Sequence, residues 1–174
     1  MLRHITCILL LSPLFLVSTV QAQEVRVVTR IVKDTVPTWK TWKSEEFIIN
    51  HPGSWGARVP SGTDTAVVFR RHDRPVEISV VGFRGDAPSF EQRVAAGLHQ
   101  GKVEVLRNDG RTETVPDRVE YAYEEGGIRI LAMEEVMHGE GRSYILTYLA
   151  PADTFGENLY MAEAMFNSFS PVGR

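Results

Sequence analysis

Short apolar runs separated by turn residues occur along most of the chain, and their two-residue alternation predicts β-strands. The first run, Phe47 to Asn50, is followed by His51-Pro52-Gly53. Pro52 is expected to end this strand because it cannot donate to a sheet ladder. The predicted strands are 47–50, 67–69, 76–83, 102–106, 118–125, 128–138 and 142–150.

The runs after residue 101 are expected to form an antiparallel meander, because turn sequences connect them. In the last run, Tyr144 and Leu146 share one face, whereas Ile145 and Leu149 share the other. A sheet that is apolar on both faces must be covered on both faces. The turns are Asn108-Asp109-Gly110, Gly126-Gly127 and Gly139-Glu140-Gly141.

Two segments have helical spacing instead. In 87–102, Ser89 and Gln92 fit a capping box and Gly101 is a plausible stop. In 153–171, Thr154 and Glu157 fit a second capping box. The apolar residues there, including Phe155, Leu159, Phe166 and Phe169, follow the helical period, and Pro171 bars continuation.

These elements predict an α+β fold. We expect an α-β-α sandwich, in which an antiparallel sheet of about six strands is covered by helices on both faces. The length of 174 residues indicates one domain, placed at 38–171. Residues 23–37 form either an additional strand or a tether.

Residues 1–22 predict a signal peptide. The apolar run Ile5 to Val17 has the length of a signal-peptide core, and Val20 and Ala22 suit cleavage before Gln23. The alternative is an uncleaved anchor, although the run is shorter than the roughly 20 apolar residues of a membrane span. The sequence therefore predicts a periplasmic or secreted protein with no transmembrane segment in its mature chain.

The position of the one cysteine and the net charge argue against several classes of function. Cys7, the one cysteine, follows Ile5-Thr6 without the small residue that precedes a lipid-modified cysteine, so no lipoprotein is predicted. The mature chain would then have no thiol chemistry. The net charge of −3 and the absence of a basic stripe argue against nucleic-acid binding.

The best surface candidate is the turn Arg70 to Pro75. Arg70, Arg71, His72 and Arg74 could dock an acidic partner or an anionic headgroup, because arginine makes bidentate contacts with carboxylate and phosphate. The alternative is a solvated hairpin tip with its own ion pairs, which contribute little. Loops on rigid scaffolds often carry function.

Trp55 has two interpretations. It either packs over the end of the sheet, where its large apolar area would anchor the turn, or it stacks on a ligand. We take it as an anchor. The predicted structural anchors are Pro52, Trp55, Phe155, Leu159, Phe166 and Phe169.

Metal binding is considered at His138, which lies near Glu134 and Glu140 in the sequence. His51 and His72 could join such a site only if the fold brought them there. The alternative is a polar strand end beside a turn. Since HExxH and HxH spacings do not occur in the sequence, no metal and no other cofactor is predicted.

Catalytic motifs are also missing. The sequence contains no GxSxG elbow and no glycine-rich phosphate loop, so no catalytic residue is predicted. Residues distant in sequence could still converge. The adjacent pairs Glu45-Glu46, Glu124-Glu125 and Glu134-Glu135 point to opposite faces of their strands, and we expect them to keep sheet edges soluble.

The order of motifs resembles PsbP-like domains. The lead-in WKTWKSEEF, then FIINHPGSW, resembles the start of that family, and GRSYILTYLAPADTFGENLYMAEAMFNSFSP resembles its closing strand, loop and helix. The resemblance covers most of 38–171. His51 departs from the tyrosine that is frequent before the proline, and the lipid-attachment cysteine of some relatives is missing.

The resemblance implies an α-β-α sandwich and a function in binding or assembly. The family includes photosystem II subunits of the thylakoid lumen, bacterial envelope lipoproteins and nuclear proteins that bind a small GTPase. It has no shared catalytic residues to carry over. We therefore expect a non-catalytic exported module that docks to another envelope protein. The alternative is a periplasmic domain that binds a small ligand or metal between helix and sheet.

Overall fold

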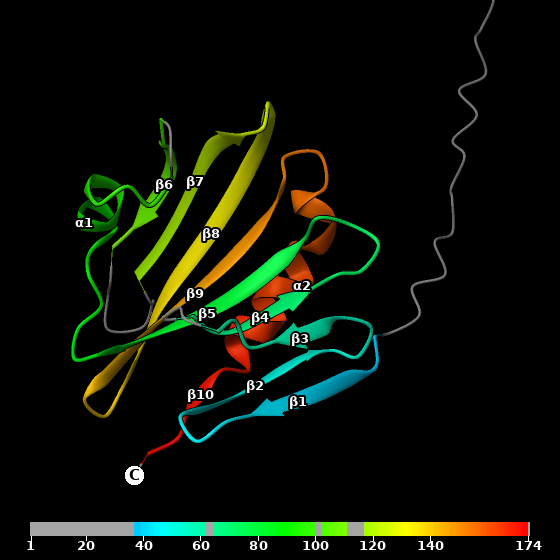
Figure 1. The fold of residues 1–174 in the computed structure, drawn as a ribbon, viewed down its shortest axis with the longest axis vertical. Coiled ribbons are helices and arrows are strands. Elements are labelled where there is room, and N and C mark those ends of the chain that lie inside the picture. Colours follow the sequence, from blue (N-terminus) through cyan, green and yellow to red (C-terminus); the bar gives the residue numbers. More distant parts are fainter. Residues whose placement is uncertain (1–36, 62–64, 100–101, 111–116, 174) are drawn as a thin grey trace, which may run out of the picture. The chain divides into compact units, whose positions relative to one another are not determined.

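The computed structural model describes residues 37–61, 65–99, 102–110 and 117–173. The predicted signal peptide, the lead-in 23–36 and the predicted helix stop at Gly101 lie outside these residues. The described residues form two antiparallel sheets and two α-helices (Figure 1). No described helix has both the length and the apolar character needed to cross a bilayer.

The larger sheet has seven strands in the order β3-β4-β5-β9-β8-β7-β6. Every neighbouring pair in it is antiparallel, and β7, β8 and β9 form the predicted meander. The strands are β3 (Gly56–Arg58), β4 (Thr65–Arg70), β5 (Glu77–Arg84), β6 (Glu104–Asp109), β7 (Asp117–Glu125), β8 (Ile128–Gly139) and β9 (Arg142–Pro151).

The smaller sheet has three strands in the order β1-β2-β10, and it joins the two ends of the described chain (Figure 1). They are β1 (Trp39–Lys43), β2 (Phe47–Pro52) and β10 (Ser170–Pro171). The prediction of a single sheet is therefore wrong. The strand at Phe47 also runs further than predicted, because His51 and Pro52 pair with Lys40 and Trp39 of β1.

One predicted turn is wrong. Asn108 and Asp109 belong to β6, where they pair with Val119 and Arg118 of β7, so these two residues extend the strand; β6 and β7 are nevertheless antiparallel neighbours, as predicted. The turn at Gly126-Gly127 does occur. Both glycines have positive φ, 58° and 79°, as the tight connection between β7 and β8 requires.

The two helices begin differently. At α1 (Phe90–Ala95) the predicted capping box is present: the Ser89 hydroxyl accepts from the Gln92 amide and the Gln92 side chain accepts from the Ser89 amide. At α2 (Phe155–Asn167) the predicted box is wrong, because the Thr154 hydroxyl donates to the Pro151 carbonyl instead. Helix α1 ends well before Gly101.

Two apolar clusters lie on opposite faces of the seven-stranded sheet. Met133 of β8 and its neighbour Tyr148 of β9 belong to the larger cluster, together with α2 and β2. Ala132 and Tyr121 belong to the smaller cluster, which includes Phe90 of α1. The α+β class is therefore observed, whereas cover by a helix over the whole of both faces remains a prediction, since α1 has six residues.

The pair Glu134-Glu135 does not keep a sheet edge soluble, as the sequence analysis expected. Glu134 is 3% exposed and Glu135 is 7% exposed, in the middle of β8. Their opposite directions are as predicted. Arg93 of α1 pairs with Glu134, and Arg118 of β7 pairs with Glu135. Each buried carboxylate is thus compensated on its own face.

Candidate functional site

The arginine-rich turn connects β4 to β5 and is closed by its own backbone. The Arg71 amide donates to the Val76 carbonyl over 3.1 Å, and the Val76 amide donates to the Arg74 carbonyl over 2.8 Å. Pro75 has no amide hydrogen to donate, and neither of these two bonds requires one from it. The turn is therefore a defined loop at the ends of two inner strands of the sheet.

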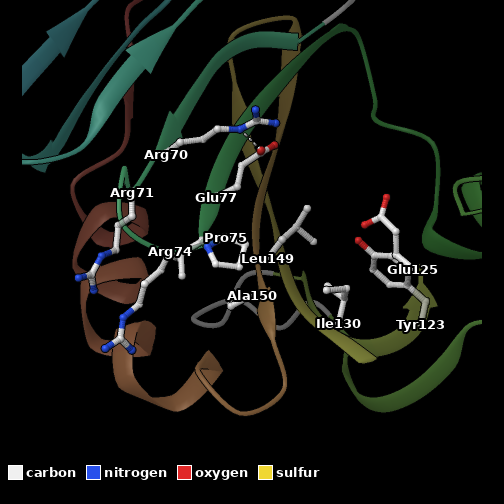
Figure 2. Close-up of a pocket in the computed structure, with 11 residues that line it drawn as sticks. Arg70, Arg71, Arg74, Pro75, Glu77, Tyr123, Glu125, Ile130, Leu149 and Ala150 are labelled. Carbon is white, nitrogen blue, oxygen red and sulfur yellow. Dashed lines mark hydrogen bonds and ion pairs between the residues drawn. The ribbon is translucent and has the colours of Figure 1, made fainter. Parts of the chain in front are cut away.

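The three arginines of this turn each have partners of their own. Arg70 pairs with Glu77 of β5, and Arg74 pairs with Glu157 of α2. Arg71 donates to Asp73 through two nitrogens, at 2.9 and 2.7 Å, and to the buried Asn158 of α2 at 2.7 Å. Figure 2 shows the heads of Arg71 and Arg74 directed away from Leu149 and Ile130. The arginines therefore do not converge on one anion site.

His72 lies on the β3 side of the turn, where it lines a second hollow together with Arg70, Arg71 and Arg58. Its ring lies against Gly56 of β3, where an added Cβ would come within 2.9 Å of His72 Cε1. Gly56 thus permits the close approach of this ring to the strand. Of the four residues predicted to bind a partner, only the three arginines line the hollow described next.

A hollow of about 350 Å³ lies beside the turn, and we call it the Pro75 hollow. It opens on the face of the sheet that carries the smaller apolar cluster, at the end of the sheet away from α1 (Figures 1 and 2). Its lining residues are Arg70, Arg71, Arg74, Pro75, Val76, Glu77, Tyr123, Glu125, Ile130, Leu149 and Ala150.

Strand pairing brings this lining together. Glu77 of β5 pairs with Leu149 of β9, and Ile130 of β8 pairs with Tyr123 of β7. The strand order β5-β9-β8-β7 then places the four strand ends next to one another. No local sequence pattern predicted that Tyr123, Glu125, Ile130 and Leu149 line one hollow, because their proximity depends on this strand order.

The electrostatic environment of the hollow is acidic around Tyr123. Burial, followed by the charges of Glu125 and Glu77, raises the pKa of the Tyr123 phenol to about 12. His99 stacks on the same ring with centroids 3.7 Å apart and supports it from the other side. The phenol therefore stays protonated, and the two carboxylates set the local field.

The predicted anchors lie on the other face of the sheet. Trp55 is 4% exposed and Phe166 is 1% exposed, and both belong to the larger apolar cluster. Phe155, Leu159 and Phe169 are partly buried against that cluster. Pro52 is buried and is paired with Trp39. So little of the Trp55 side chain is exposed that a ligand could not stack on its ring without displacing its neighbours.

The residues considered for metal binding have other partners. His138 Nδ1 lies 3.2 Å from the Ser143 hydroxyl, which itself donates to the Gly85 carbonyl. Glu134 accepts from the Tyr121 hydroxyl at 2.8 Å. His51 Nδ1 donates to the Pro52 carbonyl over 3.0 Å, because a carbonyl oxygen can only accept. Within the described ranges, no three histidine, cysteine or acidic side chains are grouped so that they could hold a metal ion.

Comparison with solved structures gives the fold. The chain superposes on cyanobacterial PsbP (CyanoP) from Synechocystis sp. PCC 6803 with a TM-score of 0.59 and 15% identity, over 79% of this chain and 94% of that one. The fold is PsbP-like. LpqN of Mycobacterium tuberculosis, a protein involved in cell envelope biogenesis, matches with a TM-score of 0.48 and 11% identity, over 82% and 95% of the two chains. No family model and no curated protein sequence matches the chain.

The PsbP-like fold confirms the resemblance noted from the motifs at both ends of the domain. The middle of the chain, where that resemblance depends on pattern rather than on residues, supplies β7 and β8 of the sheet. It also supplies the half of the Pro75 hollow that no motif indicated.

Proposed function

We propose that the protein is an exported, non-catalytic binding module of a bacterial envelope that docks another protein at the Pro75 hollow. The observation that carries the proposal is the composition of the hollow. Half-buried Ile130 and Leu149 form its floor beside Pro75, and charged side chains of the turn and of β7 surround them. An apolar centre within a polar rim is the usual anatomy of a protein interface.

The size of the hollow suits one anchoring side chain of a partner. Energetic hot spots of interfaces are such pockets, filled by one side chain and surrounded by contacts that exclude water. Ile128, the partner of Glu125 in the β7–β8 pairing, is 55% exposed and extends the apolar surface beyond the hollow. Together these residues offer a surface larger than the hollow itself.

The chemistry of the lining favours binding over catalysis. Its polar groups are arginine, glutamate and the protonated phenol of Tyr123, and each arginine is already paired with a carboxylate or amide. None of the lining residues is a serine, cysteine or histidine that could act as nucleophile or neutral-pH base. The PsbP-like fold is consistent with this proposal.

Site-specific photo-cross-linking tests the docking surface. A benzoylphenylalanine is introduced at Ile128, next to the hollow, and separately at Val105 of β6, which is exposed to a similar degree at 51%. Irradiation of intact cells should give a discrete cross-linked product from Ile128 and none from Val105. Equal products from both positions, or none from either, would contradict docking at the Pro75 hollow.

The two remaining parts of the proposal have their own tests. Amino-terminal sequencing of the exported protein should begin at Gln23, whereas an intact leader would support the uncleaved anchor. Native mass spectrometry of gently purified protein should give the bare chain and a larger species that contains a second protein. A discrete small added mass would instead support the ligand-binding alternative.

A further inference from the structure

We infer that the side chain received by the Pro75 hollow is basic, a lysine or arginine of the partner protein. This inference rests on the proposed docking function and names the chemistry of the bound group. The number of arginines in the turn would suggest an acidic side chain instead. Those arginines are already paired with other side chains of this protein.

The charges of the hollow do not cancel. The heads of Arg71 and Arg74 are directed toward α2, where Asn158 and Glu157 hold them. Arg70 is compensated by Glu77 at the rim. Glu125 is exposed and forms no ion pair with any residue in the described ranges. The charge that faces the hollow without compensation is therefore negative.

The floor of the hollow suits the stem of a long basic side chain. Leu149 and Ile130 lie between Glu77 and Glu125, as the strand order and Figure 2 show. Lysine and arginine place their methylene groups on apolar surface and keep the charged head in water. A basic side chain could thus cover Leu149 and Ile130 while its head lies near Glu125, whereas an acidic side chain would meet the uncompensated charge of Glu125.

The phenol of Tyr123 lies near both carboxylates that line the hollow. Glu125 and Glu77 belong to different strands, β7 and β5, yet the charges of both raise the pKa of this phenol. A cation placed there would be attracted mainly by Glu125, because Glu77 is already paired with Arg70, and the exposed Glu125 can turn toward it at little cost.

The chain provides a matched control for Glu125. Glu124 is its neighbour in β7 and is also exposed, but consecutive strand residues point to opposite faces. Glu124→Arg and Glu125→Arg therefore change the net charge equally, at adjacent positions, and only Glu125→Arg changes the hollow. Both side chains are exposed, so neither substitution should prevent folding.

The experiment measures the binding of three acetylated and amidated peptides, Gly-Leu-Arg-Leu-Gly, Gly-Leu-Gln-Leu-Gly and Gly-Leu-Glu-Leu-Gly, by NMR titration of the purified protein. The arginine peptide should shift the backbone amides of Glu125, Ile130 and Leu149 and bind about fivefold more tightly than the glutamine peptide, since one exposed ion pair contributes up to about that factor. The glutamate peptide should bind most weakly.

The substitutions should change this order in opposite ways. Glu125→Arg should reverse it, so that the glutamate peptide binds best, whereas Glu124→Arg should leave the preference for arginine in place. Equal binding of all three peptides, or an arginine preference that survives Glu125→Arg, would overturn the inference. If a cross-link from Ile128 nevertheless forms, the docking function stands and only the basic side chain is wrong. If neither is seen, both proposals fail.

Discussion

The two faces of the seven-stranded sheet are stabilised in different ways. On the face that carries α2, the long helix and the three-stranded sheet bury a large, mostly apolar cluster that includes Trp55, Phe69 and Phe166. On the face that carries α1, the six-residue helix buries one side chain, Phe90, against a smaller cluster of aromatic residues. The packing on the α2 face is stabilised mainly by buried apolar area, whereas the packing on the α1 face also needs specific polar contacts.

A chain of hydrogen bonds and an ion pair holds the α1 face together. The Tyr121 hydroxyl donates to Glu134 Oε1, and because its proton is used there, its oxygen accepts from His99 Nε2, 3.2 Å away. Thr147 also donates to Glu134, and Arg93 Nη1 lies 2.6 Å from Oε2. The Pro75 hollow lies beyond this network along the same face of the sheet, and no residue of α1 lines it. The comparison teaches that the thinner cover is on the face that carries the candidate site.

The largest expected effect comes from the α2 face. Phe166→Ala should lower the free energy of unfolding by about 3–5 kcal/mol, because it leaves a cavity in a fully packed cluster. Phe90→Ala on the α1 face should cost less, about 3 kcal/mol, since water can enter the edge of the smaller cluster. Urea denaturation measures both. An equal or larger loss for Phe90→Ala would remove the distinction between the two faces.

The next largest loss of stability is expected from breaking the buried ion pair between Arg93 and Glu134. Arg93→Ala should cost about 3–5 kcal/mol, because Glu134 would stay buried without a counter-charge. The double variant Arg93→Met with Glu134→Gln should regain a large part of that loss, since the amide can still accept from Tyr121. Thermal unfolding of the single and double variants measures this coupling. Additive losses would mean that the pair does not act as a unit.

The two helices should also differ in how much the hydroxyl group before the first helical residue contributes to stability. Ser89→Ala should cost about 1 kcal/mol, because it removes the acceptor for the Gln92 amide at the start of α1. Thr154→Ala should cost less than about 0.5 kcal/mol, because its hydroxyl bonds to Pro151 outside the helix. The denaturation midpoints of the two variants compare them directly. A larger loss at Thr154 would show that its bond to Pro151 matters more than a helix cap.

The smallest expected effect is on how the free energy of unfolding depends on pH. Burial lowers the pKa of His51 below its usual value of 6.5, so the unfolded chain takes up a proton more readily than the folded one. The stability linked to His51 is complete above pH 6.5 and is lost as the pH falls toward the folded pKa. His51→Leu should therefore flatten the decline of the unfolding free energy between about pH 7 and 5. An unchanged slope would assign that decline to other groups.

Much of the domain follows from local patterns. The runs at β4, β5, β7, β8 and β9 lie within a few residues of the predicted strands, because alternating apolar residues between turn residues leave few alternatives. Ser89 caps its helix as predicted, whereas Thr154 does not, because the Pro151 carbonyl lies close enough to accept the hydrogen bond of its hydroxyl. Asn108-Asp109 failed as a turn because pairing with β7 outweighed local turn preference.

The sequence by itself determined seven of the strands and the positions of both helices, since periodicity and turn chemistry act over a few residues, and the motifs at its two ends carried the resemblance to PsbP-like domains. The short strands β1, β3 and β10 were not predicted. Only the tertiary structure decided the division into two sheets, the burial of Glu134 and Glu135, and the separation of Arg70, Arg71 and Arg74. It also joined Glu77, Leu149, Ile130 and Glu125 into one hollow. These features depend on which strands pair, and strand pairing is decided by the burial of both faces of the whole sheet rather than by any single segment.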